Sequence, residues 1–520
     1  MKKITYILIA LFVISTGVYA QGQMDALRFS QGDMFGTARA MGMGGAFGAL
    51  GGDQTGVSIN PAGIAIYGRN EVVGTFQFME NRAIVGDDNR GRGSFNMPSF
   101  GFVGYFPLRS HSMPFINVGF TYNQSQSFNR RVRGMGELNN SLLDFIADRS
   151  FGWDDSELGF QFNNQGGTTF DPFQAGAPWL SALAYNAQLM NRGADGHWAA
   201  VVPFTEAPFS QINMHERGFV DHFGFTLGTT INNVLSLGAS LNVTTVSYRL
   251  DSWYDEDFNN GGFTLYNMLT TDGAGIGGRF GLIFKPVHEF RIGISYHTPT
   301  RFALRETFEA EIEHNMDSYI ANPSGYNVIF SGRFSNEYDL RTPDRWVFSA
   351  AGILGDLIIS ADYEITNFSN MRLLPPANAR FNRDPFADDN QFIQEDFRMA
   401  STFRLGLDYR ITPQFSVRAG YAWMQNPNTD SFQNNGNPAV AGSNTIFMVQ
   451  GDANMFTAGL GYWFNRNLFL DFALVYRTQT NDLFAFPNIL FDNGDLAVDA
   501  TPFEMRNNSF RGILTLGYRF

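Results

Sequence analysis

The sequence predicts an all-β fold: a transmembrane antiparallel β-barrel of about fourteen strands, with its N-terminal segment held inside the lumen as a hatch. Three observations predict it. Hydrophobicity alternates with a period of two from about residue 70 onward, glycine (55) and phenylalanine (53) are abundant while only 16% of residues are charged, and a glycine-rich stretch without alternation precedes the first strand. No linker or charge block suggests a division into several domains.

Residues 1–20 have the pattern of a secretory signal peptide. Lys2 and Lys3 form a charged start, residues 4–13 are apolar, and Val18-Tyr19-Ala20 resembles a cleavage site. The apolar run is too short to span a bilayer as a helix. We therefore expect export and a mature chain that begins near Gln21.

The alternation predicts which side chains face lipid and which face the lumen. In residues 357–367 one face is apolar and the other carries charges in mid-strand, and the same pattern returns in later segments. A transmembrane barrel needs such strands, because lipid surrounds it and its interior is polar. We expect leucines 357, 405, 470 and 516 to face lipid, and Asp362, Arg404, Asp471 and Arg511 to face the lumen.

Fourteen strands are predicted between residues 70 and 520. They lie near 70–79, 99–107, 115–128, 219–231, 234–253, 277–285, 289–312, 332–353, 356–368, 396–411, 414–425, 454–465, 467–479 and 509–520. Long connections follow the odd strands and short ones the even strands, as expected for outer loops and periplasmic turns. The longest connection, 129–218, is predicted to be an extracellular loop with helices. The last strand ends in Phe520, which is similar to the C-terminal signature of bacterial outer-membrane barrels.

Residues 21–69 do not alternate and are predicted to form the hatch. They contain many glycines and the run Asn60-Pro61-Ala62-Gly63, which suits tight turns and close backbone packing. A lumen enclosed by fourteen strands is too wide for side chains alone to fill. The hatch segment is the only long stretch on the periplasmic side, so we expect it to fill the lumen.

This hatch segment resembles that of the FadL/TodX family of outer-membrane transporters of hydrophobic compounds. The matching features are Arg-Ala-Met-Gly at 39–42, Gly-Gly-Ala-Phe at 44–47, which ends at Phe47, and Asn-Pro-Ala at 60–62. Further along, YHTPT at 296–300 and RTPDRW at 341–346 resemble the family's seventh and eighth strands. The resemblance implies passive transport of fatty acids or aromatic hydrocarbons, with lateral exit beside a kinked third strand. Gly119 is the candidate for that kink, because glycine tolerates a bulge.

Two stretches of the 129–218 loop have helical periodicity. Leu142 and Phe145 fall on one apolar stripe, and Trp179 and Leu183 fall on another. They are candidates for an outer groove that captures a hydrophobic ligand. The alternative is that two helices pack these faces together in a capping subdomain.

Composition argues against several other functions. The chain has no cysteine, and its net charge of −13 does not suit a nucleic-acid partner. An acidic group, Asp251 and 255–257, is expected in an outer loop but lacks the spacing of an EF-hand. The seven histidines show no metal-ligand spacing, and no catalytic grouping is evident. We therefore expect no enzyme activity, no metal and no cofactor.

The leading functional hypothesis is a monomeric outer-membrane channel for hydrophobic small molecules. Its expected partners are its ligand, the outer-membrane lipid and the barrel assembly machinery. Two alternatives stay open: a FadL-like barrel that serves as a docking partner in protein secretion, and a surface receptor that binds haem or another host molecule through its outer loops.

Overall fold

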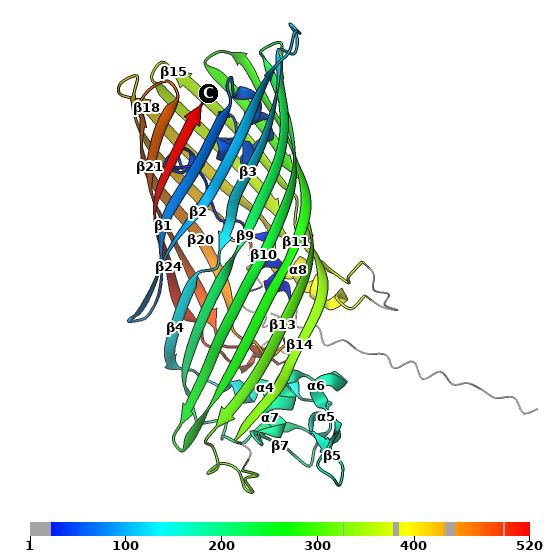
Figure 1. The fold of residues 1–520 in the computed structure, drawn as a ribbon. Coiled ribbons are helices and arrows are strands. Elements are labelled where there is room, and N and C mark those ends of the chain that lie inside the picture. Colours follow the sequence, from blue (N-terminus) through cyan, green and yellow to red (C-terminus); the bar gives the residue numbers. More distant parts are fainter. Residues whose placement is uncertain (1–21, 326, 378–383, 431, 433–441, 492–494) are drawn as a thin grey trace, which may run out of the picture.

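Fourteen antiparallel strands close into one barrel in the part of the chain that the computed structural model describes, residues 22–325, 327–377, 384–430, 432, 442–491 and 495–520 (Figure 1). The ring closes because β1 pairs with β2 on one side and with β24 on the other. This confirms the predicted fold class and strand number. The predicted signal peptide, residues 1–20, lies outside the described residues.

Three of the fourteen strands are interrupted and therefore carry two labels each. The wall strands, in order, are β1 (Glu71–Val85), β2 (Asp88–Pro107), β3 (Phe115–Ser127) with β4 (Arg130–Glu137), β9 (Phe209–Ile231), β10 (Leu235–Phe258), β11 (Gly261–Val287), β12 (Phe290–His297) with β13 (Arg301–His314), β14 (Val328–Arg341) with β15 (Arg345–Leu354), β16 (Leu357–Asn367), β18 (Met399–Arg410), β19 (Phe415–Met424), β20 (Phe447–Trp463), β21 (Leu468–Phe484) and β24 (Phe503–Arg519).

The remaining elements lie inside the barrel, at its outer end or beside it. The hatch segment holds α1 (Gln23–Ser30), α2 (Ala38–Gly42), α3 (Gln54–Ile59) and η1 (Pro61–Ile66). The outer cap holds α4 (Leu142–Arg149), α5 (Asp155–Leu158), β5 (Gln161–Phe162), β6 (Thr168–Phe170), α6 (Pro172–Ala175), α7 (Trp179–Asn186), β7 (Met190–Arg192) and β8 (Trp198–Ala200). Other outer connections hold η2 (Phe368–Asn370), β17 (Arg372–Leu374), α8 (Ala387–Asp396), β22 (Ile489–Leu490) and β23 (Leu496–Val498). No helix among the described residues is long and apolar enough to cross a membrane.

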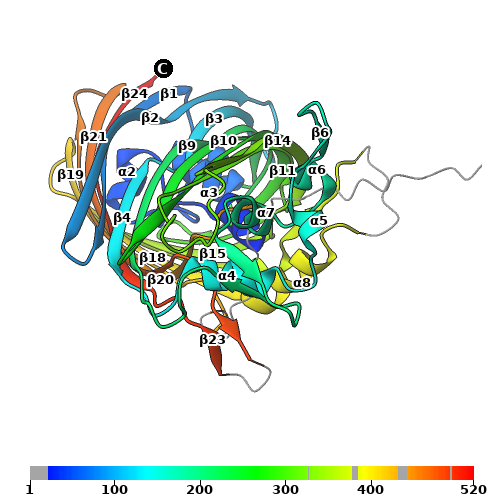
Figure 2. The ribbon, with the colours of Figure 1, turned by 90° about the horizontal axis from the view of Figure 1, so that it is seen from below.

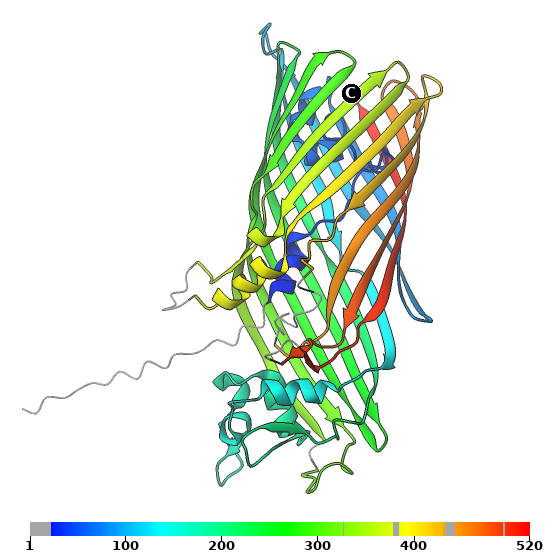
Figure 3. The same cartoon turned by 180° about the vertical axis from the view of Figure 1, so that it is seen from behind.

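The hatch and the cap lie at opposite ends of the barrel. The helices α2, α3 and η1 lie inside the end that holds the C-terminus, which is the periplasmic end given the short turns there (Figure 1). The cap lies at the other end, and the view from that end shows α4 and α7 in front of part of the opening (Figure 2). The helix α1 reaches farther out than the rest of the hatch and lies beside α8 (Figure 3).

The predicted facing of the side chains is confirmed. Leu405 and Leu516 are 38% and 49% exposed on the outer surface, whereas Asp362 and Arg511 are each only 1% exposed. Strand alternation therefore separates a lipid-facing apolar surface from a charged interior.

Two expected outer loops are in fact strand, and the loop predicted at 129–218 is strand at both ends, in β4 and in the first part of β9. The chain continues as β-hairpins through 80–98, with a turn after Val85, and through 254–276, with a turn after Phe258. The prediction ended these strands where their apolar faces end. The ladders continue beyond that point because backbone pairing does not depend on an uninterrupted apolar face.

Candidate functional site

The Asn-Pro-Ala turn of the hatch is fixed by one buried amide. Asn60 is 1% exposed. Its side-chain nitrogen donates to the carbonyl oxygen of Gly48 at 2.8 Å and to that of Leu282, in β11, at 3.1 Å. Its side-chain oxygen accepts from the backbone N–H of Ala62 at 3.1 Å. A single side chain thus shapes the turn, holds it to the preceding loop and ties it to the wall.

Wall glycines let the backbone of the hatch approach the strands. A Cβ atom on Gly281 would clash with the side chain of Asn60, and one on Gly238 would clash with the Pro61 carbonyl. A Cβ atom on Gly293 would lie 2.5 Å from the Gly48 carbonyl oxygen. Only glycine fits at these inward-facing positions of β10, β11 and β12. The hatch is therefore packed against the wall and leaves little free space at this level.

Phe47 lies in the core of the hatch and is fully buried. Its backbone N–H and that of Gly48 each donate to the Asp362 carboxylate of β16 at 3.0 Å. The Arg39 guanidinium lies over the Phe47 ring, 5.3 Å from its centroid. Through these contacts Phe47 helps to anchor the hatch to the wall. It does not line any of the cavities described below.

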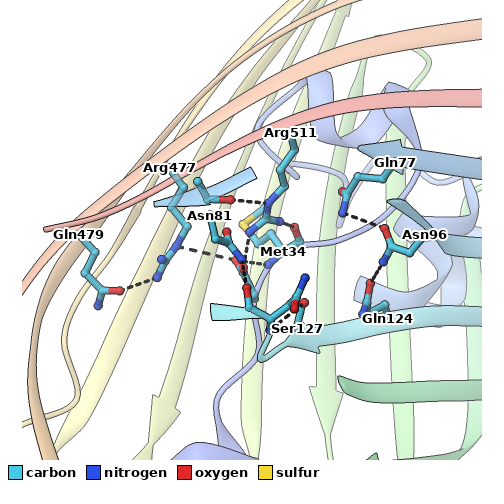
Figure 4. A network of polar contacts seen from close by, with 12 residues as sticks. Met34, Gln77, Asn81, Asn96, Gln124, Ser127, Arg477, Gln479 and Arg511 are labelled. Atoms are coloured by element: carbon cyan, nitrogen blue, oxygen red, sulfur yellow. Dashed lines mark hydrogen bonds and ion pairs between the residues drawn. The ribbon is translucent and has the colours of Figure 1, made fainter. Parts of the chain in front are cut away.

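The link between α1 and α2 is held by arginines of the wall (Figure 4). Arg511 donates to the Met34 carbonyl at 2.7 Å, pairs with Asp33 and lies over the Phe35 ring at 4.4 Å. Arg477 lies 3.8 Å from the same carboxylate. Burial alone would raise the pKa of Asp33, but the two guanidinium groups outweigh it and hold this pKa below its usual value. The carboxylate therefore stays ionised and anchors the link.

The third strand is interrupted between Ser127 and Arg130, where β3 ends and β4 begins. A register shift against β9 precedes the break, between Gln124 and Gln126. Gly119, the expected kink, pairs regularly with Val103 and Thr226, so this expectation is corrected. A Cβ atom at Gly119 would lie 2.6 Å from the terminal methyl group of Ile64 in the hatch, so this glycine allows a close approach of the hatch and does not mark a bulge.

Beside this break the ladder of the wall is open. Over the described residues, the outer part of β2 (88–98) pairs with β1 only, and β4 pairs with β9 only. Side chains make the connections instead: Asn96 of β2 bonds to Gln124 of β3, and Asn81 of β1 donates to the Asn129 carbonyl at 3.0 Å (Figure 4). We call the region between these edges the lateral gap. Its lock consists of these amide hydrogen bonds and of the ion pair between Arg133 of β4 and Asp88 of β2, 3.6 Å apart, in place of a backbone ladder.

An interior cavity of about 200 Å³ lies directly behind the lateral gap. Met79 of β1, Ser127 of β3, and Phe128 line it on the wall side, and Leu27 and Arg28 of α1 line it on the inner side. A smaller cavity of about 80 Å³, with His222, Arg279 and His297 in its lining, shares Gln31 and Gly32 with the first. The loop after α1 thus separates two compartments of one interior space.

A larger cavity of about 570 Å³ lies on the periplasmic side of the hatch. Charged groups dominate its lining, among them Arg39, Asp53 and Glu71. Burial raises the pKa of Asp53, although Arg39 and the hydroxyl of Thr37 counteract it. This space is a mainly polar vestibule, in which a few apolar side chains such as Val73 and Ile353 lie among charged groups.

The four outer-groove candidates do not form an exposed groove. Trp179 and Phe145 are 2% exposed, and Leu142 and Leu183 are fully buried. The Trp179 ring lies 4.6 Å from that of Phe308 in β13, so α7 packs onto the barrel. The apolar stripes therefore form the core of the cap and attach it to the wall, which is the packing alternative.

The acidic group at 251–257 also lies elsewhere than expected. It belongs to the strand β10, not to a loop. Asp251 pairs with Arg249 at 2.7 Å, and Glu256 is buried, where it accepts from the Leu142 N–H at 2.7 Å. Among the described residues no group of three histidine or acidic side chains is placed to hold a metal ion.

Sequence reasoning missed the side chains that lock the lateral gap. Asn81, Asn96 and Gln124 are ordinary amides in alternating strands. The one available signal was the run TYNQSQSFN at 121–129, where amides and serines replace the usual apolar residues near the end of a strand. Its meaning depends on the neighbouring strand, which the sequence does not identify.

Comparison with known proteins agrees with this architecture. A family model described as outer membrane protein transport protein (OMPP1/FadL/TodX) matches residues 221–518. The structure is similar to that of a Pseudomonas aeruginosa FadL homologue, with 14% identity, a TM-score of 0.52, and coverage of 94% of this chain and 100% of the other. It is also similar to that of the Ralstonia pickettii toluene transporter TbuX, with 14% identity, a TM-score of 0.50, and coverage of 94% and 98%. No curated protein sequence matches significantly.

Proposed function

The chain belongs to the OMPP1/FadL/TodX family of outer-membrane transport proteins, and we propose that it conducts small hydrophobic molecules from its interior sideways into the membrane through the lateral gap. The proposed substrates are long-chain fatty acids or aromatic hydrocarbons. The process is passive diffusion through a monomer, without catalysis.

One observation supports the proposal most strongly. The interior cavity lies behind the part of the described wall where residues 88–98 of β2 pair with β1 but with no strand on their other side. Opening a paired stretch of wall would break several backbone hydrogen bonds in lipid, where each unsatisfied group costs several kcal/mol. Opening the lateral gap requires only the separation of side chains: two amide hydrogen bonds, each worth about 0.5–1.5 kcal/mol net, and the Arg133–Asp88 ion pair, whose partners are 3.6 Å apart.

The periplasmic route is less favourable for an apolar solute. The hatch lies between the interior cavity and the vestibule, tied to the wall through Asn60 and Asp362. Past it, the solute would enter a space lined by charged groups and would gain nothing from desolvation. Lateral release keeps its apolar surface out of water, which is favourable by about 25 cal/mol per Å² relative to release into the aqueous vestibule.

The interior cavity suits a molecule that is mainly apolar and carries a polar end. Met24, Leu27 and Met79 provide apolar contacts, and Arg28 and Asn81 provide polar ones in the same lining. An amphiphile can use both kinds of contact, whereas a hydrocarbon can use only the first. The proposed substrates include both fatty acids and aromatic hydrocarbons.

The test is uptake by a Gram-negative host that lacks its own transporter of hydrophobic compounds. Cells that display the protein in the outer membrane should take up labelled oleate or labelled toluene faster than cells with an empty vector. The intact protein should conduct little current in planar bilayers, because the hatch fills the lumen. Correctly inserted protein that accelerates uptake of neither compound would overturn the proposal and favour the docking role.

A further inference from the structure

The smaller interior cavity, of about 80 Å³, is lined by basic side chains and, among the described residues, by no acidic one. We call it the basic cavity. Its volume is several times what one water molecule needs, but it is too small for a long acyl chain. Its basic residues are His222 of β9, Arg279 of β11, His297 of β12 and Arg345 of β15.

The strand register places three of these basic side chains next to one another on the inward face. Arg279 lies opposite His297, and His297 lies opposite Arg345, in consecutive pairs across β11, β12 and β15. The positions that continue this row on either side hold Ser240 and Thr366, which carry no charge. Like charges this close on one face of a sheet are unfavourable. Two guanidinium groups therefore share a short stretch of wall with no acidic neighbour in the row.

Two of the basic side chains bond to the hatch and have no acidic partner. Arg279 donates to the Ser58 carbonyl at 2.9 Å and forms no ion pair within the described part of the chain. The Nε2 atom of His297 donates to the Ile59 carbonyl at 2.8 Å. A carbonyl oxygen accepts a hydrogen bond but brings no full negative charge. The guanidinium of Arg279 thus lies inside the barrel without a carboxylate in direct contact, which is costly.

The other groups of the lining add to this excess of donors. Arg345 pairs with Glu364 at 3.0 Å, but the same carboxylate also pairs with Arg404 and so serves two guanidinium groups. Ser30, the last residue of α1, lines the cavity and is 7% exposed, and its hydroxyl has no hydrogen-bond partner among the described residues. Buried hydroxyls are rarely left without a partner, so Ser30 marks a place for a bound molecule.

We propose that the basic cavity binds a small oxyanion, either an inorganic one or the carboxylate end of a transported amphiphile. An oxyanion between Arg279 and Arg345 would supply the missing counter-charge and accept from the Ser30 hydroxyl. Guanidinium groups suit this task because their paired N–H groups match the spacing of oxyanion oxygens. The basic cavity shares Gln31 and Gly32 with the larger interior cavity, so a carboxylate bound here would leave its chain on the other side of that loop.

The position of the site is tested with selenate, whose selenium scatters anomalously. In crystals of the full chain soaked in selenate, we expect a peak inside the basic cavity, within hydrogen-bonding distance of Arg279 and Arg345. Selenate found on the outer surface only would be an adventitious ion only, and would overturn the proposal.

The strength of the site is tested with labelled sulfate and the purified full chain in non-ionic detergent. Arg279→Gln should weaken binding by about tenfold or more, because it removes charge-assisted hydrogen bonds. Ser30→Ala removes only the unpartnered hydroxyl and should weaken binding about fivefold. The matched control is Arg291→Gln: Arg291 of β12 also donates to a hatch carbonyl, that of Leu50 at 2.6 Å, but does not line the cavity. It should bind sulfate like the wild type.

The heat-induced gel shift of a folded barrel should confirm that each variant is intact. Equal weakening by Arg279→Gln and Arg291→Gln would indicate a general charge effect and overturn the proposal, as would unchanged binding by both Arg279→Gln and Ser30→Ala.

A fatty acid brominated at the far end of its chain distinguishes the two sources of the oxyanion. If its carboxylate occupies the basic cavity, it should displace selenate and place its bromine in the larger interior cavity. If selenate stays and the bromine lies elsewhere, the ligand is an inorganic oxyanion. A cavity that takes neither compound would overturn the proposal. The uptake assay is independent of this result, because uptake by a protein without an oxyanion site would leave the proposed function standing.

Discussion

The wall is interrupted in two places, and only one of them is open. On one side, β12 gives way to β13 and β14 to β15 at adjacent Thr-Pro sequences. Here the Thr300 N–H donates to the Thr342 hydroxyl at 2.9 Å, the Thr342 N–H donates to the Thr300 carbonyl at 3.0 Å, and the Thr298 N–H donates to the Gly278 carbonyl at 2.9 Å. We call this the sealed break.

Where the third strand is interrupted, its backbone forms hydrogen bonds with β9 but not with β2. The Phe128 N–H donates to the Gly218 carbonyl of β9 at 3.0 Å, whereas toward β1 and β2 the polar contacts come from side chains: two amide hydrogen bonds and the Arg133–Asp88 ion pair. The difference shows that a broken strand does not by itself open a barrel. An opening forms where the neighbouring strand also fails to supply backbone partners.

The largest expected effect concerns a third route, straight through the hatch. Gly281→Leu would drive a side chain into Asn60, whereas Gly352→Leu on β15 would meet open space. We expect the first variant to dislodge the hatch, at a cost of about 1–3 kcal/mol, and to conduct ions steadily in planar bilayers. The second should stay nearly non-conducting. Equal currents from both variants would show that wall glycines do not hold the hatch.

The sealed break should matter for stability more than for transport. Thr342→Val removes the hydroxyl that accepts from the Thr300 N–H and leaves that group unsatisfied, which costs about 1–3 kcal/mol. The unfolding midpoint in urea should fall while uptake stays unchanged. Thr307→Val, at an exposed hydroxyl pair with Ser335, is the control and should change neither. A rise in ligand release on Thr342→Val would remove the contrast between the two breaks.

The contact between α1 and α8 should depend on pH. Burial, together with the nearby Asp388 and Asp25, raises the pKa of Asp389 to about 7. Because this pKa is raised in the folded state, the contribution of the protonated form is complete at low pH and is lost as the pH rises through about 7. Hydrogen exchange of α8, corrected for its intrinsic pH dependence, should accelerate by up to about tenfold per pH unit between pH 3.8 and about 7, as for one linked proton, and should level off above 7. Asp389→Asn should abolish this dependence, and its persistence would assign it to another group.

The smallest effect is expected at the lock of the lateral gap. Asn96→Ala removes one amide bond to Gln124, worth about 1 kcal/mol, and should speed ligand release about fivefold with little change in stability. Asn163→Ala, an exposed amide of the cap, serves as the control. Release kinetics from proteoliposomes provide the measurement. Unchanged release would mean that this bond does not limit opening.

The sequence alone predicted the features that depend on local pattern. Alternation placed Leu405 outside and Asp362 inside, because each strand has only two faces. It did not place the lateral gap, because the gap arises from missing pairing between β2 and the end of the third strand. Gly119 was selected for its conformational freedom, but its role is to admit Ile64. Likewise, the apolar stripe of Trp179 did not reveal whether it lines a groove or packs on the wall.

The most direct test locks each break with a disulfide, which is unambiguous because the chain has no cysteine. In N96C/Q124C the bond would join β2 to β3 across the lateral gap, and in T300C/T342C it would join the two halves of the sealed break. Ligand release from proteoliposomes should stop when the first variant is oxidised and return on reduction, while the second should release ligand at the wild-type rate in both states. Full-speed release from oxidised N96C/Q124C would contradict lateral exit through this gap.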